Sequence, residues 1–234
     1  MAASIKMLFA FLFVFCVTAH SFAVIAAPDT GEKKMDSVHR ETQILGHPPR
    51  IEPLSPSNYS DDIKNLVAEV REAVGAPPVE VIPEYFATMA KHPQLMRQQI
   101  DLSMTFFKGY LSTRDRQLAI LRTLWLNQAP YAWSQHVDVS KREAGFSTEE
   151  IDSITKGAAA GNWNDQDRAI LLAVEELHDD AMISAQTWSV LASRLSEQEL
   201  LELPLLVGTY QATAYLQNSV GFRLMGGFKG LQAR

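Results

Sequence analysis

From Ser60 onward, apolar residues recur at every third or fourth position, which is the spacing of one face of an α-helix. The alternating apolar and polar pattern of a half-buried strand does not compete with it. Two segments begin with the capping-box spacing, in which a serine and a glutamate three residues later satisfy each other's backbone donors. These pairs are Ser147 with Glu150 and Ser196 with Glu199. The pattern therefore predicts an all-α fold of about eight helices.

Prolines, glycines and small polar residues mark where these helices should begin and end. Ser60 and Gly75 bracket the first helix. Pro83 and Pro93 can each begin a helix, because the first turn does not use the N–H that proline lacks. Asn164 and Ser184 can cap two more, and the clearest remaining helices are expected at 113–127, 130–145, 147–157 and 196–218.

The first 26 residues have a different pattern. Lys6 precedes an apolar run over residues 7–19, and small residues follow it up to Ala26, an order typical of a secretory signal peptide. A membrane anchor is the alternative, but the run has roughly 13 residues where about 20 are needed to cross a bilayer. We therefore expect residues 1–26 to be a signal peptide, with a secreted or periplasmic mature chain and no stable membrane insertion after cleavage.

Residues 27–57 are rich in proline, charge and small polar side chains, and four prolines at 48, 49, 53 and 56 disfavour regular structure. This segment is predicted to be a flexible arm, either a linker or a strap on the surface. Residues 58–234 follow as one helical domain, because a chain of 234 residues with 47% hydrophobic positions can build one sizeable core.

Charge and cysteine content exclude several functions. The net charge is −6, from 27 acidic and 21 basic side chains, so nucleic acid is not an expected partner. Cys16 is the only cysteine and would leave with the signal peptide, so the mature chain would have neither a disulfide nor a thiol. Neither a metal nor another cofactor is expected, because metal-ligand spacing does not connect His39, His47, His92 and His178.

Three motifs in a fixed order carry most of the information: TRDRQLAILR at 113–122, YAWSQH at 131–136 and AGFSTEEI at 144–151. Weaker elements precede them at 89–95 and follow them from Asp167 to Asn218. Together they resemble the carboxymuconolactone decarboxylase family over most of the mature chain. The resemblance implies an all-helical fold similar to alkylhydroperoxidase D, homo-oligomers such as trimers or hexamers, and a small-molecule pocket around the helix with the Trp-x-x-His element.

The chain departs from this family at the reactive positions. The redox branch carries two cysteines, seven and four residues before the histidine, and an upstream glutamate. Ala129, Ala132 and Gln117 occupy those positions here. Peroxide reduction of that kind needs a thiolate and a second thiol that resolves it, so a thiol peroxidase is excluded for the mature chain. The decarboxylase branch commonly has glutamate at the position of Ala132, and the chain departs there too.

His136 is what remains of the acid/base set. Helical spacing places it on a face that should be buried, shared with Ala129, Ala132, Trp133, Val137 and Ser140. An ordinary histidine pKa near 6.5 allows proton exchange close to neutrality, so His136 is our candidate catalytic residue. The alternative is a neutral, hydrogen-bonded core histidine.

Four more residues are candidates for binding the substrate. Tyr131 and Trp133 would form apolar walls, and Ala132 would leave room for a flat ring or lactone, unless it only lets two helices approach closely. Gln117 would hydrogen-bond the substrate or its own neighbours. A lyase-type enzyme that decarboxylates or isomerises a small carboxylated or lactone-like molecule is therefore expected, and a non-catalytic small-molecule-binding relative is the alternative.

The apolar segment 226–231 follows the last predicted helix without an evident partner. It would either support a homo-oligomer or fold back on its own subunit.

Overall fold

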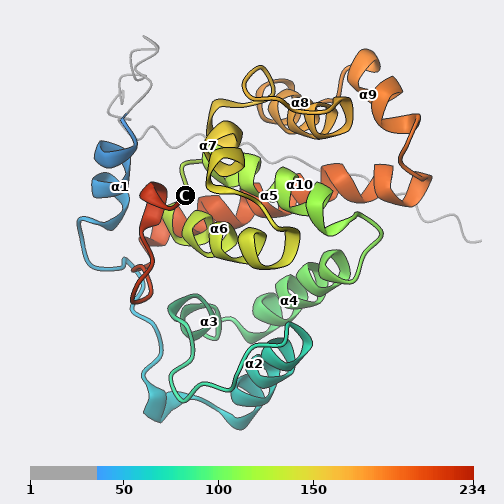
Figure 1. Ribbon diagram of the computed structural model, residues 1–234. Coiled ribbons are helices and arrows are strands. Elements are labelled where there is room, and N and C mark those ends of the chain that lie inside the picture. Colours follow the sequence, from blue (N-terminus) through green and yellow to red (C-terminus); the bar gives the residue numbers. More distant parts are fainter. Residues whose placement is uncertain (1–35) are drawn as a thin grey trace, which may run out of the picture. The chain divides into compact units, whose positions relative to one another are not determined.

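The computed structural model describes residues 36–234, which form ten α-helices and two 3-10 helices and contain no strand (Figure 1). The all-α prediction is confirmed for this part of the chain, with more helices than the eight or so expected. The predicted signal peptide lies outside the described residues, and none of the described helices is long and apolar enough to span a bilayer. The elements are α1 (Ser37–Leu45), η1 (Pro56–Asn58), α2 (Asp61–Ala73), α3 (Glu84–Met89), α4 (Pro93–Phe107), α5 (Thr113–Leu126), α6 (Pro130–Ala144), α7 (Thr148–Lys156), α8 (Asp165–Asp180), α9 (Ala185–Ala192), α10 (Glu197–Val220) and η2 (Gly230–Gln232).

The expected capping residues begin the helices. Both capping boxes form, at the start of α7 with Ser147 and Glu150 and at the start of α10 with Ser196 and Glu199. Gly145 ends α6 in the left-handed conformation with φ of 69°, which glycine adopts without steric cost. These local signals therefore fix where the helices begin and end.

Residues 37–45 differ from the expectation of a flexible arm, because they form helix α1. Asp36 caps this helix, and Ile44 is buried. The helix contacts η2, where Oε2 of Glu41 accepts a hydrogen bond of 2.6 Å from the backbone N of Leu231. The four prolines at 48, 49, 53 and 56 all lie after this stretch, so they do not prevent a helix there.

Helix α5 is the centre of the core. Its residues from Asp115 to Leu124 are all buried, and it packs against α6, α7, α8 and α10. Figure 1 shows α5, α6 and α10 between α8 and α9 on one side and α2, α3 and α4 on the other. The latter three helices form a second hydrophobic cluster, against which Leu216 of α10 packs. The seam between these two clusters holds the candidate site.

Helices α5 and α8 start with the same local structure. Ser112 caps α5 by accepting a hydrogen bond of 3.0 Å from the backbone N of Asp115, and Asn164 caps α8 by accepting one of 2.8 Å from that of Asp167. Each cap satisfies one of the backbone donors that the first turn leaves unpaired. Asp115 and Asp167 therefore occupy equivalent positions in the first turns of the two helices.

Each of these aspartates also ties its helix to a distant element. Asp115 pairs with Arg194, with 2.8 Å between its Oδ2 and Nη1 of the arginine. Asp167 pairs at 2.8 Å with Arg114, which also contacts Glu150 at 2.7 Å. Both aspartates are buried, so these ion pairs couple the starts of α5 and α8 to the rest of the core.

The C-terminal segment folds back on its own subunit. Leu231 is completely buried, and the indole Nε1 of Trp133 donates a hydrogen bond of 3.2 Å to the carbonyl of Ala233. Lys141 donates one of 2.6 Å to the carbonyl of Arg234. Of the two alternatives for this segment, fold-back on the same chain is confirmed.

Candidate functional site

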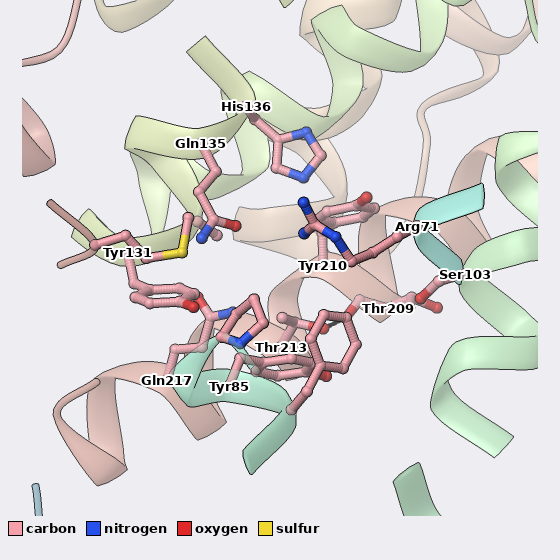
Figure 2. Close-up of a pocket in the computed structure, with 14 residues that line it drawn as sticks. Arg71, Tyr85, Ser103, Tyr131, Gln135, His136, Thr209, Tyr210, Thr213 and Gln217 are labelled. Carbon is pink, nitrogen blue, oxygen red and sulfur yellow. Dashed lines mark hydrogen bonds between the residues drawn. The ribbon is translucent and has the colours of Figure 1, made fainter. Parts of the chain in front are cut away.

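A cavity of about 300 Å³ lies between α6 and α10 and the α2–α4 cluster (Figure 2). Five elements line it, because α6 and α10 run along one side while α2, α3 and α4 close the other. The polar side chains that matter below are Arg71, Tyr85, Tyr131, His136, Tyr210 and Gln217. The cavity is large enough for a small organic molecule.

His136 projects from α6 into this cavity, toward Arg71 and Tyr210 (Figure 2). Its Nδ1 lies 3.2 Å from Oε1 of Gln117, on the neighbouring helix α5. An amide oxygen can only accept a hydrogen bond, so Nδ1 carries the proton and Nε2 keeps a free lone pair. The ring of Tyr210 meets the imidazole edge to face, with centroids 5.0 Å apart. Gln117 and Tyr210 therefore hold the imidazole in one orientation and one tautomer.

The environment keeps His136 and the tyrosines of the cavity neutral at pH 7. Burial lowers the pKa of His136, the positive charge of Arg116 lowers it further, and together they bring it to about 4. Burial raises the pKa of Tyr85 to about 12, with a contribution from Tyr131, and it also raises the pKa of Tyr210. The imidazole is therefore a proton acceptor and the phenols are hydrogen-bond donors.

Two arginines give the cavity a positive character. Arg71 lines it and donates from Nε to the carbonyl of Pro77. Arg116 is buried, donates a hydrogen bond of 3.3 Å to the carbonyl of Phe107, and lies 5.5 Å from the centroid of that ring. Within residues 36–234 neither arginine pairs with a carboxylate, and the lining contains no aspartate or glutamate. Arg116, which lies behind the lining, is the buried one, and a buried charge without a carboxylate partner is costly. Together with the partly buried Arg71 at the lining, it makes the cavity favour an anion.

The structure brings most of the predicted site residues together. His136, Tyr131 and Ala132 line the cavity, and Gln117 stands behind the imidazole rather than in the lining. Trp133 does not reach it, because its ring packs against Trp125 with centroids 5.0 Å apart and its Nε1 is bonded to the C-terminal segment. Successive helical residues point about 100° apart, so Ala132 faces the cavity while its neighbour Trp133 faces the core.

Several site residues were not predicted from the sequence. Arg71, Tyr85 and Gln217 come from α2, α3 and α10, which are remote in sequence from the Trp-x-x-His helix. Tyr210 fell within the family resemblance without an assigned role. An arginine and a tyrosine of amphipathic helices carry no local signal that distinguishes a cavity position from a solvated one.

The described residues offer no alternative chemistry based on a metal or thiol. Among residues 36–234, His, Cys, Asp and Glu side chains do not gather in groups of three that could hold a metal ion. The same range contains no cysteine. The reactive and charged groups at the site are the imidazole, the phenols and the arginines.

Comparison with known proteins supports the family at the level of sequence and fold. Residues 93–176 match the model of the Carboxymuconolactone decarboxylase family, a stretch that runs from α4 into α8 and includes Gln117, Tyr131 and His136. No curated protein matches the chain.

Solved structures share the fold at low sequence identity. An uncharacterized peroxidase-related protein from Ralstonia eutropha JMP134, with an alkylhydroperoxidase AhpD core, aligns with a TM-score of 0.65 and 17% identity, covering 77% of this chain and 94% of that one. A peroxidase-related protein from Silicibacter sp. TM1040 gives 0.64 and 13%, covering 77% and 95%. A variant of the debrominase Bmp8, in complex with 2,3,4-tribromopyrrole, gives 0.62 and 15%, covering 76% and 92%.

The family match covers the helix that carries His136 and the helix that carries Gln117, and the shared fold extends over about three quarters of the chain. Residues 93–176 therefore form a region that matches the carboxymuconolactone decarboxylase family, within a helical fold like that of the AhpD-like structures.

Proposed function

We propose that this protein binds a small organic anion in the cavity and isomerises it, with His136 as the proton acceptor. The observation that supports this most is the combination of a neutral imidazole with two arginines that lack carboxylate partners within residues 36–234. The family name adds a carboxylated lactone as the type of molecule to test.

The binding half of the proposal follows from the charges around the cavity. Arg71 lies at the lining, and Arg116 lies close enough to His136 to affect its pKa. A ligand carboxylate at Arg71 would gain a charge-assisted hydrogen bond, which is stronger than a neutral one. It would also partly offset the positive charge of Arg116.

The catalytic half follows from the protonation state of His136. A neutral imidazole with a free Nε2 can take a proton from a carbon next to a carboxylate or lactone carbonyl and return it to another carbon, which is an isomerisation. Decarboxylation instead needs an acid to protonate the carbanion left by CO2, and a histidine with a pKa of about 4 lacks the second, acidic proton of the imidazolium at pH 7. A bound anion would raise this pKa in part by offsetting Arg116, while burial, the larger cause, would still keep the imidazole neutral. The site therefore favours proton transfer within the substrate over loss of CO2.

A second candidate is a binding protein without catalysis. The pKa of about 4 makes His136 a weak base, and alanines occupy positions 129 and 132, where relatives carry reactive side chains. In this case His136 would only accept a hydrogen bond from the ligand. The two candidates share the cavity and its anion and differ in turnover.

Calorimetric titration with benzoate tests the binding half. Arg71→Met should weaken benzoate binding about tenfold or more, the usual size of one charge-assisted contact. Arg97→Met is the matched control, since Arg97 is exposed on α4 and paired with Asp101 at 3.0 Å. Equal affinities of wild type and Arg71→Met would contradict an anion site at Arg71.

Turnover is tested with carboxymuconolactone in D2O, followed by NMR. Isomerisation incorporates deuterium into a product that keeps its carboxylate, decarboxylation releases CO2, and a binding protein leaves the lactone unchanged. His136→Gln should abolish turnover, while His39→Gln, at an exposed position on α1, should retain it. Full turnover by His136→Gln would exclude the proposed role of the imidazole.

A further inference from the structure

Two buried polar atoms in the cavity wall make no hydrogen bond to any described residue. They are the hydroxyl of Tyr131 and Oε1 of Gln217. The side chain of Gln135 and the backbone of Tyr85 lie near the Tyr131 hydroxyl, but neither forms a hydrogen bond of good geometry with it. Tyr131 and Gln217 are 3% and 5% exposed, and both line the cavity. The threonine hydroxyls of the same wall are satisfied instead by their own helix, as Thr209 and Thr213 donate to carbonyls of α10 at 2.8 and 2.9 Å.

These two groups lie at the end of the cavity away from the imidazole. Tyr131 is one and a half turns before His136 on α6, and Leu216 and Val220 of α10 pack with its ring in one cluster. Gln217 belongs to that same stretch of α10. Figure 2 shows Tyr131 and Gln217 on one side of the cavity, with His136, Arg71 and Tyr210 on the other.

The chemistry of the pair defines what it can bind. A phenol hydroxyl both donates and accepts a hydrogen bond, and a carboxamide presents an NH2 group that donates and an oxygen that accepts. Burial raises the pKa of Tyr131, so its hydroxyl stays protonated and neutral. A carboxylate would meet the acceptor oxygen of Gln217 unfavourably, whereas a ligand hydroxyl can accept from Tyr131 and donate to Gln217.

We propose that Tyr131 and Gln217 form a subsite for a neutral hydroxyl group, so that the ligand of this cavity is a small hydroxy acid with its carboxylate at Arg71. The position of the carboxylate rests on the proposed function, and the hydroxyl subsite does not. A buried polar group left without a partner loses free energy, and a ligand hydroxyl that pairs with both groups recovers it.

The test compares ligands that differ only in this group. 4-Hydroxybenzoate and 4-methylbenzoate have nearly the same shape, and calorimetry on the full chain should show the hydroxy acid binding about tenfold more tightly, as expected for two neutral hydrogen bonds. In Tyr131→Phe the two acids should bind within about threefold of each other. Gln217→Met should also reduce the preference for 4-hydroxybenzoate over 4-methylbenzoate.

Tyr59→Phe is the matched control, because Tyr59 is also buried but belongs to the α2–α4 cluster outside the cavity. This variant should keep the tenfold preference. Tyr131→Phe should melt no lower than wild type, since it removes a hydroxyl without a protein partner, and a circular dichroism melt verifies that it is folded.

The outcomes separate this subsite from the proposed function. Equal binding of both acids to wild type overturns the hydroxyl subsite and leaves the anion site standing. If neither acid binds, the proposed anion site is contradicted. The hydroxyl subsite is then tested without a carboxylate, by comparing the affinities of phenol and toluene. A preference for phenol that Tyr131→Phe removes supports the subsite, and equal binding or no binding of the two overturns it.

Discussion

Gln117 holds His136 through a hydrogen bond of 3.2 Å between its Oε1 and Nδ1 of the ring. An amide orients the imidazole and fixes its tautomer without adding charge. A carboxylate in this place would also stabilise the protonated ring and raise its pKa. Gln117 is therefore a positioning residue that leaves the imidazole neutral, and its lack of charge is as important for the site as its hydrogen bond.

Replacing this amide by an acid should raise the pKa of His136. In Gln117→Glu an ionised carboxylate close to Nδ1 favours the imidazolium, so we expect the pKa to rise from about 4 by at least one unit. An NMR pH titration of the His136 ring protons measures it. Gln117→Leu is the control, because it removes the acceptor without adding charge and should not raise the pKa. An unchanged pKa in Gln117→Glu would show that the two side chains are not coupled.

The depressed pKa of His136 also makes stability depend on pH. In the unfolded chain His136 should titrate near 6.5, and in the folded protein near 4, so the unfolded state binds more protons between these values. The free energy of unfolding should therefore fall as the pH is lowered from 6.5 toward 4, by about 1–2 kcal/mol between pH 7 and 5. Urea unfolding at a series of pH values measures this.

His136→Gln should flatten the profile in that window. The carboxylates with lowered pKa values add a loss of the same sign, but only as the pH falls below their ordinary values near 4; they are Glu149, Glu150, Asp152 and Glu176. A wild-type profile that is flat from pH 7 to 5 would contradict the neutral, buried state of His136.

The sequence predicted the helices well and the site only in part. Capping residues such as Ser147 and Ser196 act within one turn, so their signal is local, and the structure confirms it. Trp133 was expected at the pocket because it shares a helix face with His136. A face of that width borders both the cavity and the core, and only the packing of α5 and the C-terminal segment decides which side the indole takes.

The remaining site residues depend on tertiary structure. Arg71 and Tyr85 enter the cavity because α2 and α3 pack across the seam from α6, a pairing that no local pattern encodes. The positive character of the site could not be seen in a chain with a net charge of −6, since it depends on which arginines lack a carboxylate neighbour.

Two glycines should respond to alanine with opposite signs. Gly157 has φ of 95° and ψ of −170°, and a Cβ there would lie 2.5 Å from Oε1 of Glu175 and 2.6 Å from Nη2 of Arg122. Gly157→Ala should therefore strain the backbone and disturb this ion pair, at a cost of about 2–4 kcal/mol of the unfolding free energy. Gly208→Ala, inside α10 with open space at its Cβ, should instead stabilise by about 0.5–1 kcal/mol. Denaturant unfolding of both variants measures these changes. A loss of less than 1 kcal/mol of unfolding free energy in Gly157→Ala would count against the strained geometry.

Asp115 and Arg194 should be strongly coupled. The aspartate is 4% exposed and accepts hydrogen bonds of 2.8 and 3.1 Å from Nη1 and Nη2 of Arg194. Asp115→Ala leaves the arginine without its partner and should lower the free energy of unfolding by about 2–4 kcal/mol. This is less than for a fully buried pair, because Arg194 is partly exposed to solvent. The double variant with Arg194→Met should be more stable than the sum of the two single losses implies. Additive losses in this double-mutant cycle would mean that the pair is not energetically coupled.

Leu231 of the C-terminal segment should contribute as much to the free energy of unfolding as a buried leucine of an internal helix does. Leu231 is fully buried beside α6, and its backbone N–H is held by Glu41 of α1. Leu231→Ala should lower the unfolding free energy by about 2–4 kcal/mol, the usual cost of a cavity left by a leucine. Trp133 donates a hydrogen bond to the carbonyl of Ala233, two residues after Leu231. Loosening this segment should therefore admit water to the indole and shift the tryptophan emission of the folded variant to longer wavelength. Leu201→Ala is the control, since Leu201 is 69% exposed on α10 and should change neither property. Wild-type emission together with wild-type stability in Leu231→Ala would show that the segment is not docked against Trp133 in solution.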